Sequence, residues 1–148
     1  MTSTIQIRSA GDADLAAIES LLSESQLPTA GVKDSLCGFL VAESAGRVVG
    51  VVGMEKRGNY GLLRSTAVAP AWRGKHVAKQ LVERIIADAE AQGVHALYLL
   101  TTTAERYFPS FGFAVATRDV VPEDIRATGE FRETCCASAT VMCLRLSA

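Results

Sequence analysis

A strand, a helix and a second strand follow one another in the middle of the chain, and this order constrains the fold most. Apolar residues fill the segment Gly61–Ala69 and then recur at helical spacing from Val77 until Gly93 ends the pattern. The next run, Ala96–Thr101, is too short and too uniformly apolar for a surface strand, so we expect it to be buried on both faces. Parallel strands need a crossover connection, usually a helix, and the segment therefore predicts a βαβ unit.

Shorter strands and helices surround this unit. Alternating apolar residues predict strands over Ile5–Ile7, Phe39–Glu43, Arg47–Met54, Phe113–Arg118 and Ala139–Leu146. Helical spacing predicts a helix from Asp12 to Leu22 and short helices over Val32–Leu36 and Glu105–Phe111. The 148 residues contain no repeat or linker, so we expect a single domain over residues 1–148. The fold class is mixed α/β.

The charge balance and the N-terminal segment argue against several kinds of protein. The 15 basic and 16 acidic residues leave a net charge of -1, which argues against a nucleic-acid partner. The N-terminal segment lacks the apolar region of a secretory signal, and no apolar run is long enough to span a membrane. The four cysteines have no metal-binding spacing, so we expect free thiols, no bound metal and a reducing, cytoplasmic setting.

Residues 56–82 contain no Asp or Glu but six cations. These are Lys56, Arg57, Arg64, Arg73, Lys75 and Lys79. The last three stand with His76 at the start of the long helix, where the positive end of the helix dipole disfavours cations. Gly74 and Ala78 add small side chains that let backbone N–H groups approach an anion closely. The pattern indicates a phosphate site, and a solvated basic helix start is the alternative.

The order of residues at this helix start resembles the acetyl-CoA motif of the GNAT N-acetyltransferases. The family pattern is a strand ending in V-x-P followed by [QR]-x-x-G-x-[GA], and Arg73, Val77 and Ala78 are in register with it. His76 replaces the middle glycine, and we expect an ordinary helical or near-helical backbone there. The resemblance covers essentially the whole chain. It implies a single GNAT domain with a mixed, mostly antiparallel sheet of about six or seven strands, a splayed parallel pair and about four helices.

The resemblance also assigns roles to individual residues. It implies that the strand edge Ala67–Ala69 pairs with the pantetheine amides and that the Val68 N–H meets the developing oxyanion. It implies that Arg73–Lys79 hold the pyrophosphate. The acetyl-CoA contacts implied in this way are Ala67, Val68, Ala69, Arg73, Gly74, Lys75, His76, Val77, Ala78, Lys79 and Phe108.

A second stretch, Thr101–Phe113, resembles the strand, short helix and Gly-Phe pair that follow in the family. In much of the family a Tyr four residues before this Gly112 protonates the departing thiolate, and here that position is Phe108. Tyr107 is one residue away, about 100° around a helix. We expect both aromatic side chains to be packing residues, with the thiolate protonated by water.

Finer sequence details indicate the class of acceptor. The segments LLRSTAVAP and LYLLTTTAE and the tail IRATGEFRETCCASATVM resemble small N-acetyltransferases of arsenic-resistance operons and, more distantly, N-acetylglutamate synthases. That resemblance implies an enzyme that acetylates the primary amine of glutamate or of a mimic such as arsinothricin or phosphinothricin. The alternatives are a protein N-terminal or lysine acetyltransferase, and a non-catalytic module that binds acetyl-CoA or an arsenical. A monomer and a homodimer both stay open.

The residues that would activate and hold the acceptor are a separate question. Glu55 is the acid nearest to the motif and our candidate base, although a strand-end carboxylate is usually exposed. Deprotonation through ordered water is the alternative, in which case no single residue is essential. The candidate acceptor contacts are Arg64, Ser65 and Thr102, and weaker ones are Arg126 and Arg132.

The remaining chemistry-bearing residues have simpler explanations. Arsenic binding by Cys135, Cys136 and Cys143 is disfavoured because adjacent residues on an extended strand point to opposite faces. We expect these cysteines to be small core residues. Trp72 is expected to cover the motif loop, and His95 to lie at the surface next to a strand start.

Overall fold

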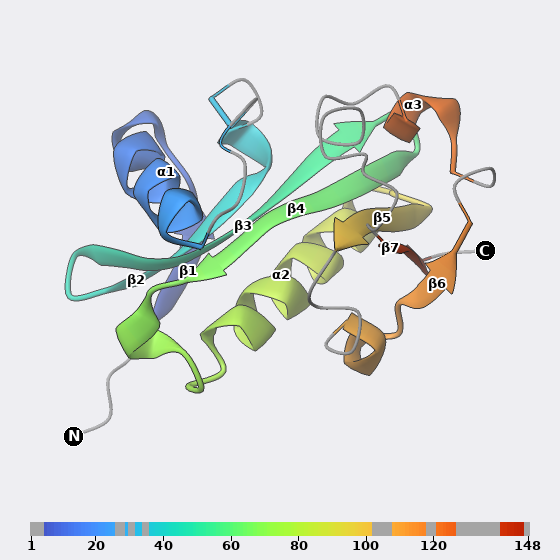
Figure 1. The fold of residues 1–148 in the computed structure, drawn as a ribbon. Helices are drawn as coiled ribbons and strands as arrows, with labels where there is room; N and C mark the ends of the chain where they lie inside the picture. The colour runs from blue at the N-terminus through green and yellow to red at the C-terminus, as the bar shows by residue number, and fades with distance from the viewer. Residues whose placement is uncertain are drawn as a thin grey trace. The chain divides into compact units, whose positions relative to one another are not determined.

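The computed structural model describes residues 5–25, 29, 32–33, 36–101, 108–117, 121–126 and 140–146. Within these residues, strands form a sheet in the order β1-β2-β3-β4-β5-β7-β6 (Figure 1). The strands are β1 (Gln6–Ser9), β2 (Phe39–Ser44), β3 (Arg47–Arg57), β4 (Tyr60–Val68), β5 (Ala96–Thr101), β6 (Ala114–Ala116) and β7 (Thr140–Arg145). The α-helices are α1 (Leu15–Glu24), α2 (Val77–Ala91) and α3 (Glu123–Arg126), and the 3₁₀ turns are η1 (Asp12–Asp14), η2 (Leu36–Gly38), η3 (Pro70–Trp72) and η4 (Phe108–Phe111). No helix in this part of the chain is long and apolar enough to cross a membrane.

The pairing of the strands is mixed and mostly antiparallel, as the resemblance to the GNAT family implies. β4 runs parallel to β5, with Tyr60–Leu62 paired to Ala96–Tyr98. β1 with β2, β2 with β3, β5 with β7 and β6 with β7 are antiparallel pairs. Because α2 lies between β4 and β5 in the sequence, these three elements form the expected βαβ unit.

The chain is organised as two compact units, each built from two stretches of sequence. One unit contains Met1–Met54 and Ser65–Ile86, and the other contains Glu55–Arg64 and Ala87–Ala148. β3, β4 and α2 each contribute residues to both units. The assignment of residues 1–148 to a single domain therefore stays a prediction.

In the first unit, α1 and α2 pack on opposite faces of β3. The isoleucine and leucine side chains of α1 form a buried cluster that includes Val51. The neighbouring Gly50 faces α2, since a Cβ there would lie 2.9 Å from Val77 Cγ1 and 3.0 Å from Leu81 Cδ1. Successive strand residues point to opposite faces, so Gly50 and Val51 contact different helices. A side chain at residue 50 would push the start of α2 away from the strand.

In the second unit, Ala96–Leu99 of β5 are buried, as the uniformly apolar sequence predicts. Tyr98 packs in one cluster with Leu62, Val141 and Ile125. Burial and then the adjacent Cys143 thiol raise the pKa of Tyr98 to about 12. Cys143 is half-buried against this cluster, which fits the prediction that it is a small core residue.

Two short helices differ from the predictions. Val32 and Lys33 lie in a turn and the 3₁₀ turn η2 follows at Leu36, so no α-helix begins at Val32. Phe108–Phe111 form the 3₁₀ turn η4 and not the end of an α-helix, and the predicted start at Glu105 lies outside the described residues. Apolar spacing over four or five residues does not distinguish an α-helical turn from a 3₁₀ turn.

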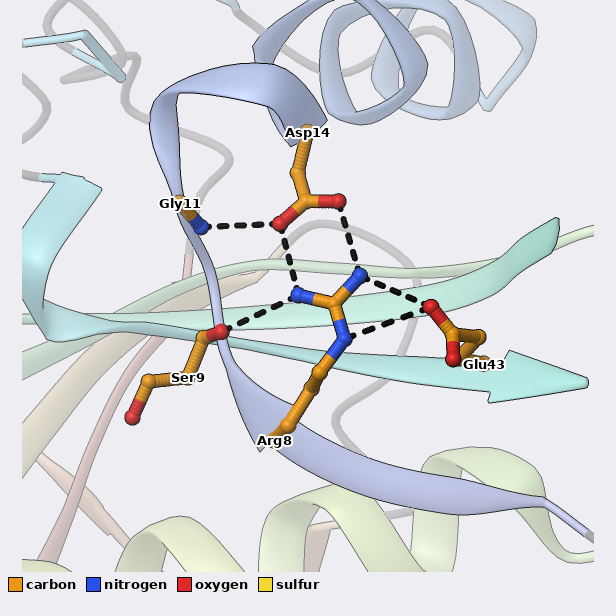
Figure 2. A network of polar contacts seen from close by, with 5 residues as sticks. All are labelled: Arg8, Ser9, Gly11, Asp14 and Glu43. Atoms are coloured by element: carbon orange, nitrogen blue, oxygen red, sulfur yellow. Dashed lines mark hydrogen bonds and ion pairs between the residues drawn. The ribbon is translucent and has the colours of Figure 1, made fainter. Parts of the chain in front are cut away.

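Arg8 of β1 holds the first turn before α1 against β2 (Figure 2). Its Nη1 and Nη2 atoms donate to the two carboxylate oxygens of Asp14 at 2.8 and 2.9 Å. Nη2 also donates to Glu43 Oε2 at 2.9 Å. The Gly11 N–H donates to Asp14 Oδ2 at 2.8 Å. The same carboxylate therefore caps the turn and also binds the Arg8 guanidinium. The hydrogen bonds from Arg8 hold the pKa of Asp14 below its ordinary value, and those to both carboxylates raise the pKa of Arg8.

Replacing Asp14 with asparagine should destabilise the protein by about 1–2 kcal/mol at neutral pH, because the three hydrogen bonds to its carboxylate, two from Arg8 and one from Gly11, are weakened. Since the pKa of Asp14 is lower in the folded state, its contribution is complete above the unfolded pKa and is lost as the pH falls through the folded one. Urea unfolding from pH 7 to pH 2 should therefore show the difference between wild type and Asp14→Asn shrinking below about pH 4. Asp12→Asn, at an exposed position in the same turn, is the control. A difference that persists at pH 2 would contradict this account.

Candidate functional site

The segment between β4 and α2 is a hydrogen-bonded loop. The Trp72 N–H donates to the Ala69 carbonyl at 2.8 Å, and the Arg73 N–H donates to the Pro70 carbonyl at 3.3 Å. Pro70 stands at the first position of η3, where its fixed φ fits the turn and its missing N–H costs no hydrogen bond. The loop is therefore ordered by its own backbone before the long helix begins.

Two residues of this loop have a left-handed backbone just before α2. Gly74 has a φ of 78° and His76 has a φ of 62°. The Gln80 N–H donates to the His76 carbonyl at 3.1 Å, so helical hydrogen bonding begins at His76. The next N–H groups, Val77–Lys79, are the first of α2, and such groups have no acceptor inside their own helix. They form a set of donors of the kind that binds anions.

Exposed positive charges surround these donors. Arg73, Lys75 and Lys79 are exposed, and so is His76. Lys75 Nζ lies 5.7 Å from the centroid of the Trp72 ring, a cation–π contact within the loop. Each cation here opposes the positive end of the helix dipole, at a cost of about 0.3–1 kcal/mol. A phosphate bound here would interact favourably both with the positive end of the helix dipole and with these cations.

The last residues of β4 present their backbone groups alternately to β3 and away from it. The Ala69 N–H donates to the Val49 carbonyl of β3 at 2.8 Å. The Ala67 carbonyl also lies on the β3 side, 3.5 Å from where a Cβ on Gly50 would be. Since consecutive strand residues face opposite sides, the N–H and C=O of Val68 point away from β3. Of the predicted edge Ala67–Ala69, Val68 is the residue whose backbone faces away from β3.

Ser65 interrupts β4 with a left-handed backbone. Its φ is 61° in the middle of an otherwise extended strand, and its side chain is buried. A left-handed residue inside a strand is typical of β-bulges, in which the strand bends and its local twist increases. A non-glycine residue in this conformation costs about 1–2 kcal/mol, so the surrounding structure must enforce it.

Glu55 is buried between two arginines in the β3–β4 hairpin. Its residue exposure is 5%, and its carboxylate oxygens lie 3.6 Å from Arg57 Nη2 and 3.8 Å from Arg64 Nη1. The Arg64 side chain is 2% exposed, whereas that of Arg57 is 45% exposed. The expectation that Glu55 is an exposed strand-end carboxylate is wrong, because β3 continues past Met54 to Arg57.

The six cations of residues 56–82 therefore divide into two groups. Arg57 and Arg64 form ion pairs with Glu55, and Lys56 Nζ donates to the Gln92 carbonyl near the end of α2 at 3.5 Å. A cation near a helix C-terminus is favourable. The remaining three, Arg73, Lys75 and Lys79, are the ones at the start of α2. Half of the six cations thus lie in the loop before α2 and in its first turn, as the sequence predicts.

Comparison with known proteins identifies the family. A family model described as the acetyltransferase (GNAT) domain matches residues 35–115, more than half of the chain. The chain belongs to the GNAT acetyltransferase family. The matched region contains the end of β4, the loop before α2 and the Glu55 ion pairs, which are the features described above.

Curated and solved relatives agree with this family. An "IAA acetyltransferase" from Azospirillum brasilense is 40% identical over 65 residues, 43% of this chain and 42% of that protein. An "Amino-acid acetyltransferase" from Ralstonia nicotianae is 34% identical over 94 residues, 62% of this chain and 21% of that protein. The matches thus span less than half the length of these relatives. The fold resembles N-acetylglutamate synthase from Neisseria gonorrhoeae, solved with coenzyme A and N-acetyl-glutamate, with a TM-score of 0.84 and 22% identity, over 100% of this chain and 36% of that one.

His76 has a left-handed backbone at the position where the GNAT motif has glycine. The expectation of an ordinary helical backbone at this residue is wrong, because its φ is 62°. The turn into α2 requires a left-handed residue at this position, and the chain adopts it with a side chain that has a Cβ. Glycine adopts such a conformation without strain, whereas His76 adopts it with a Cβ.

Replacing His76 with glycine should make the protein more stable than replacing it with alanine, by about 1 kcal/mol, because only alanine keeps the Cβ that clashes at positive φ. Urea unfolding of the two variants measures the difference directly, since both lose the imidazole. Equal stabilities would mean that residue 76 is not left-handed in solution. Gly74→Ala should show the same sign and size of effect as a control.

Phe108 is a packing residue in the described part of this GNAT chain. It is 7% exposed, and its ring centroid lies 5.7 Å from that of Phe113 in an edge-on contact and 6.5 Å from that of Phe111. A phenyl ring has no proton to give to a thiolate, so this position supplies packing and no acid. His95 is exposed, as expected, and its ring meets Tyr60 edge-on at 6.4 Å.

Several predicted residues lie outside the described part of the chain. They are Thr102, Tyr107, Arg132, Cys135 and Cys136, and the side chain of Arg126 is likewise not described. Among the residues that are described, no three His, Cys, Asp or Glu side chains lie close enough to hold a metal ion.

Sequence reasoning missed two contacts at the site. It did not pair Arg57 with Glu55, although two residues of the same parity on one strand share a face and gave a usable signal. It also missed that Arg73 Nε donates to the Val68 carbonyl at 3.2 Å. The second contact joins a loop side chain to a backbone atom, and no pattern of residue types encodes such a bond.

Proposed function

We propose that this protein transfers the acetyl group of acetyl-CoA to the primary amine of a small, amino-acid-like acceptor. The observation that carries the proposal is the start of α2 in this GNAT chain. Two left-handed residues precede the helix, its first N–H groups have no acceptor within the helix, and three exposed cations lie beside them. The amino-acid acetyltransferase and N-acetylglutamate synthase among its relatives support an amino-acid acceptor.

The pyrophosphate of acetyl-CoA would bind at the start of α2. The residues for this are Arg73, Gly74, Lys75, His76, Val77, Ala78 and Lys79. The backbone N–H groups would supply short hydrogen bonds and the lysines would supply charge without fixed geometry. Ala67–Ala69 would lie along the pantetheine, with Val68 making the backbone contacts because it faces away from β3.

The reaction itself is a direct acyl transfer. The amine nitrogen attacks the thioester carbonyl, the C–N bond forms, the C–S bond breaks, and the coenzyme A thiolate leaves. The Val68 N–H would meet the negative charge that develops on the carbonyl oxygen, a contribution that is often worth several kcal/mol in such reactions. Phe108 offers no proton, so water would protonate the thiolate.

Glu55 is our candidate for the group that accepts the proton of the acceptor amine. Its carboxylate is buried and forms ion pairs with Arg64 and Arg57. Arg64 is also our candidate contact for a carboxylate of the acceptor, because a planar guanidinium matches a carboxylate with two donors, and Ser65 and Thr102 are further candidates. Glu55→Gln should lower kcat by about 100-fold or more if the carboxylate is the base. A loss below tenfold would assign the proton to water.

We further propose that the acceptor is glutamate or a glutamate mimic of the arsinothricin or phosphinothricin kind, as in a detoxification or arsenic-resistance role. The free thiols Cys37 and Cys143 support a reducing, cytoplasmic setting. No nucleic-acid or membrane partner is part of this proposal, and the protein would act as a monomer or a homodimer.

Two measurements test the proposed function in sequence. Calorimetry with acetyl-CoA should show binding at tens of micromolar or below, and its absence would overturn the co-substrate. Release of free thiol from acetyl-CoA should then be followed with glutamate, phosphinothricin, arsinothricin, other amino acids and a peptide with a free N-terminus. Turnover confined to the peptide would overturn the small acceptor. Binding without thiol release for every amine would overturn the enzyme in favour of a binding module.

A further inference from the structure

Arg73 links the phosphate loop to the end of β4. Its Nε atom donates to the Val68 carbonyl at 3.2 Å, in a partly buried contact, while the residue as a whole is exposed. A guanidinium has five N–H donors in a fixed, planar arrangement. One N–H is therefore used on the strand while the terminal nitrogens can still reach toward solvent and an anion.

The contact completes a set of hydrogen bonds that fixes the last peptides of β4. The peptide between Val68 and Ala69 is bound at both ends, by Arg73 at its carbonyl and by the Val49 carbonyl at its N–H. The next two carbonyls, of Ala69 and Pro70, accept the N–H groups of the η3 turn. The carbonyls of Val68, Ala69 and Pro70 therefore each accept a hydrogen bond. The donor to the Val68 carbonyl is a side chain, and the donors to the other two are backbone N–H groups.

We infer that Arg73 is a positioning residue for the acyl transfer as well as a phosphate contact. This inference rests on the proposed function, in which the Val68 N–H stabilises the oxyanion. The Val68 N–H and C=O point the same way from the strand, so a side chain that anchors the carbonyl also fixes the direction of the N–H. The guanidinium adds positive charge on that same side of the strand. Oxyanion donors contribute most when they are held in place before the reaction.

Lysine at position 73 separates the two roles. It keeps a positive charge for the phosphates, but its single ammonium lacks the second arm and the planar geometry that serve the strand. We expect Arg73→Lys to bind coenzyme A with a Kd within about threefold of wild type and to lower kcat about tenfold. Arg73→Gln, which loses the charge, should weaken coenzyme A and acetyl-CoA alike, by about tenfold or more.

The chain offers a direct binding signal for this test. Its one tryptophan, Trp72, lies next to Arg73 in the loop, so intrinsic fluorescence can follow titration with coenzyme A and with acetyl-CoA. Coenzyme A carries the same phosphates as acetyl-CoA but has no thioester carbonyl. For Arg73→Lys the acetyl-CoA affinity should therefore fall about threefold further than the coenzyme A affinity. Arg47→Lys, at an exposed position on the β2–β3 hairpin, is the control and should match wild type in both titrations and in turnover.

The outcomes separate this inference from the proposed function. If wild type binds acetyl-CoA but Arg73→Lys changes the affinities for acetyl-CoA and coenzyme A equally, Arg73 contacts phosphate alone and the inference is overturned. A selective loss for acetyl-CoA together with a lower kcat supports it, since a general weakening of the loop would lower both affinities. Failure of wild type to bind acetyl-CoA would instead remove the proposed function. The two titrations need no acceptor, so they decide the inference even when the acceptor screen finds none.

Discussion

Replacing Arg64 with methionine should destabilise the protein by about 3–5 kcal/mol, the range found when one partner of a buried ion pair is removed. Glu55 is 5% exposed and would remain buried with the carboxylate 3.6 Å from Arg57 but without the guanidinium at 3.8 Å. Urea unfolding at pH 7 is the measurement. Glu55→Leu should cost a similar amount, because it removes the carboxylate from a guanidinium that is 2% exposed.

Arg57 provides a matched control for this prediction. It contacts the same carboxylate at a similar distance, yet its side chain is 45% exposed. Water screens such a pair, so Arg57→Met should cost less than about 1 kcal/mol. The double variant Glu55→Leu/Arg64→Met should recover most of the stability lost by either single variant, since apolar side chains can replace a buried pair. If Arg64→Met cost no more than Arg57→Met, burial would not be what makes the pair strong.

This pair also shows the limit of what the sequence predicts. The strands β3 and β4, the long helix and the buried β5 strand follow from apolar spacing, because the order of apolar and polar residues reflects which face of an element is buried. The order of residues does not predict the burial of Glu55. That burial depends on how far β3 continues past Met54 and on which partner faces the carboxylate, and both are set by tertiary packing.

The backbone conformations of single residues are also not predicted by the sequence. The chain reverses between β2 and β3 at Ala45 and Gly46, which both have positive φ. Glycine is common in such turns, so Gly46 makes this turn predictable from the sequence. Ser65 and His76 also have positive φ, although neither is a glycine. Their conformations are imposed by the strand and by the turn into α2. Contacts such as Arg8 with Glu43, which are 35 residues apart, are equally invisible to periodicity.

The basic residues before and within the first turn of α2 predict a second large effect, with opposite signs for stability and for binding. Lys75→Met/Lys79→Met should raise the Kd for acetyl-CoA on the order of 100-fold, because two charge-assisted phosphate contacts are removed. The same change should stabilise the unliganded protein by about 0.3–1 kcal/mol through Lys79, because a cation opposes the helix dipole there. At Lys75 the gain is offset by loss of the cation–π contact with Trp72. A purely structural role for these lysines predicts loss of stability and of binding together.

Calorimetry with acetyl-CoA from 50 to 500 mM salt measures the first effect, and urea unfolding measures the second. Affinity of the wild type should fall with salt more steeply than that of the double variant, since screening acts on the charges that the variant lacks. S-acetylpantetheine, which carries no pyrophosphate, should bind both proteins equally. Lys33→Met, at an exposed position in the turn before η2, should leave both affinity and salt dependence at their wild-type values. An unchanged acetyl-CoA affinity in the double variant would remove the phosphates from the start of α2 and with them the site on which the proposed function depends.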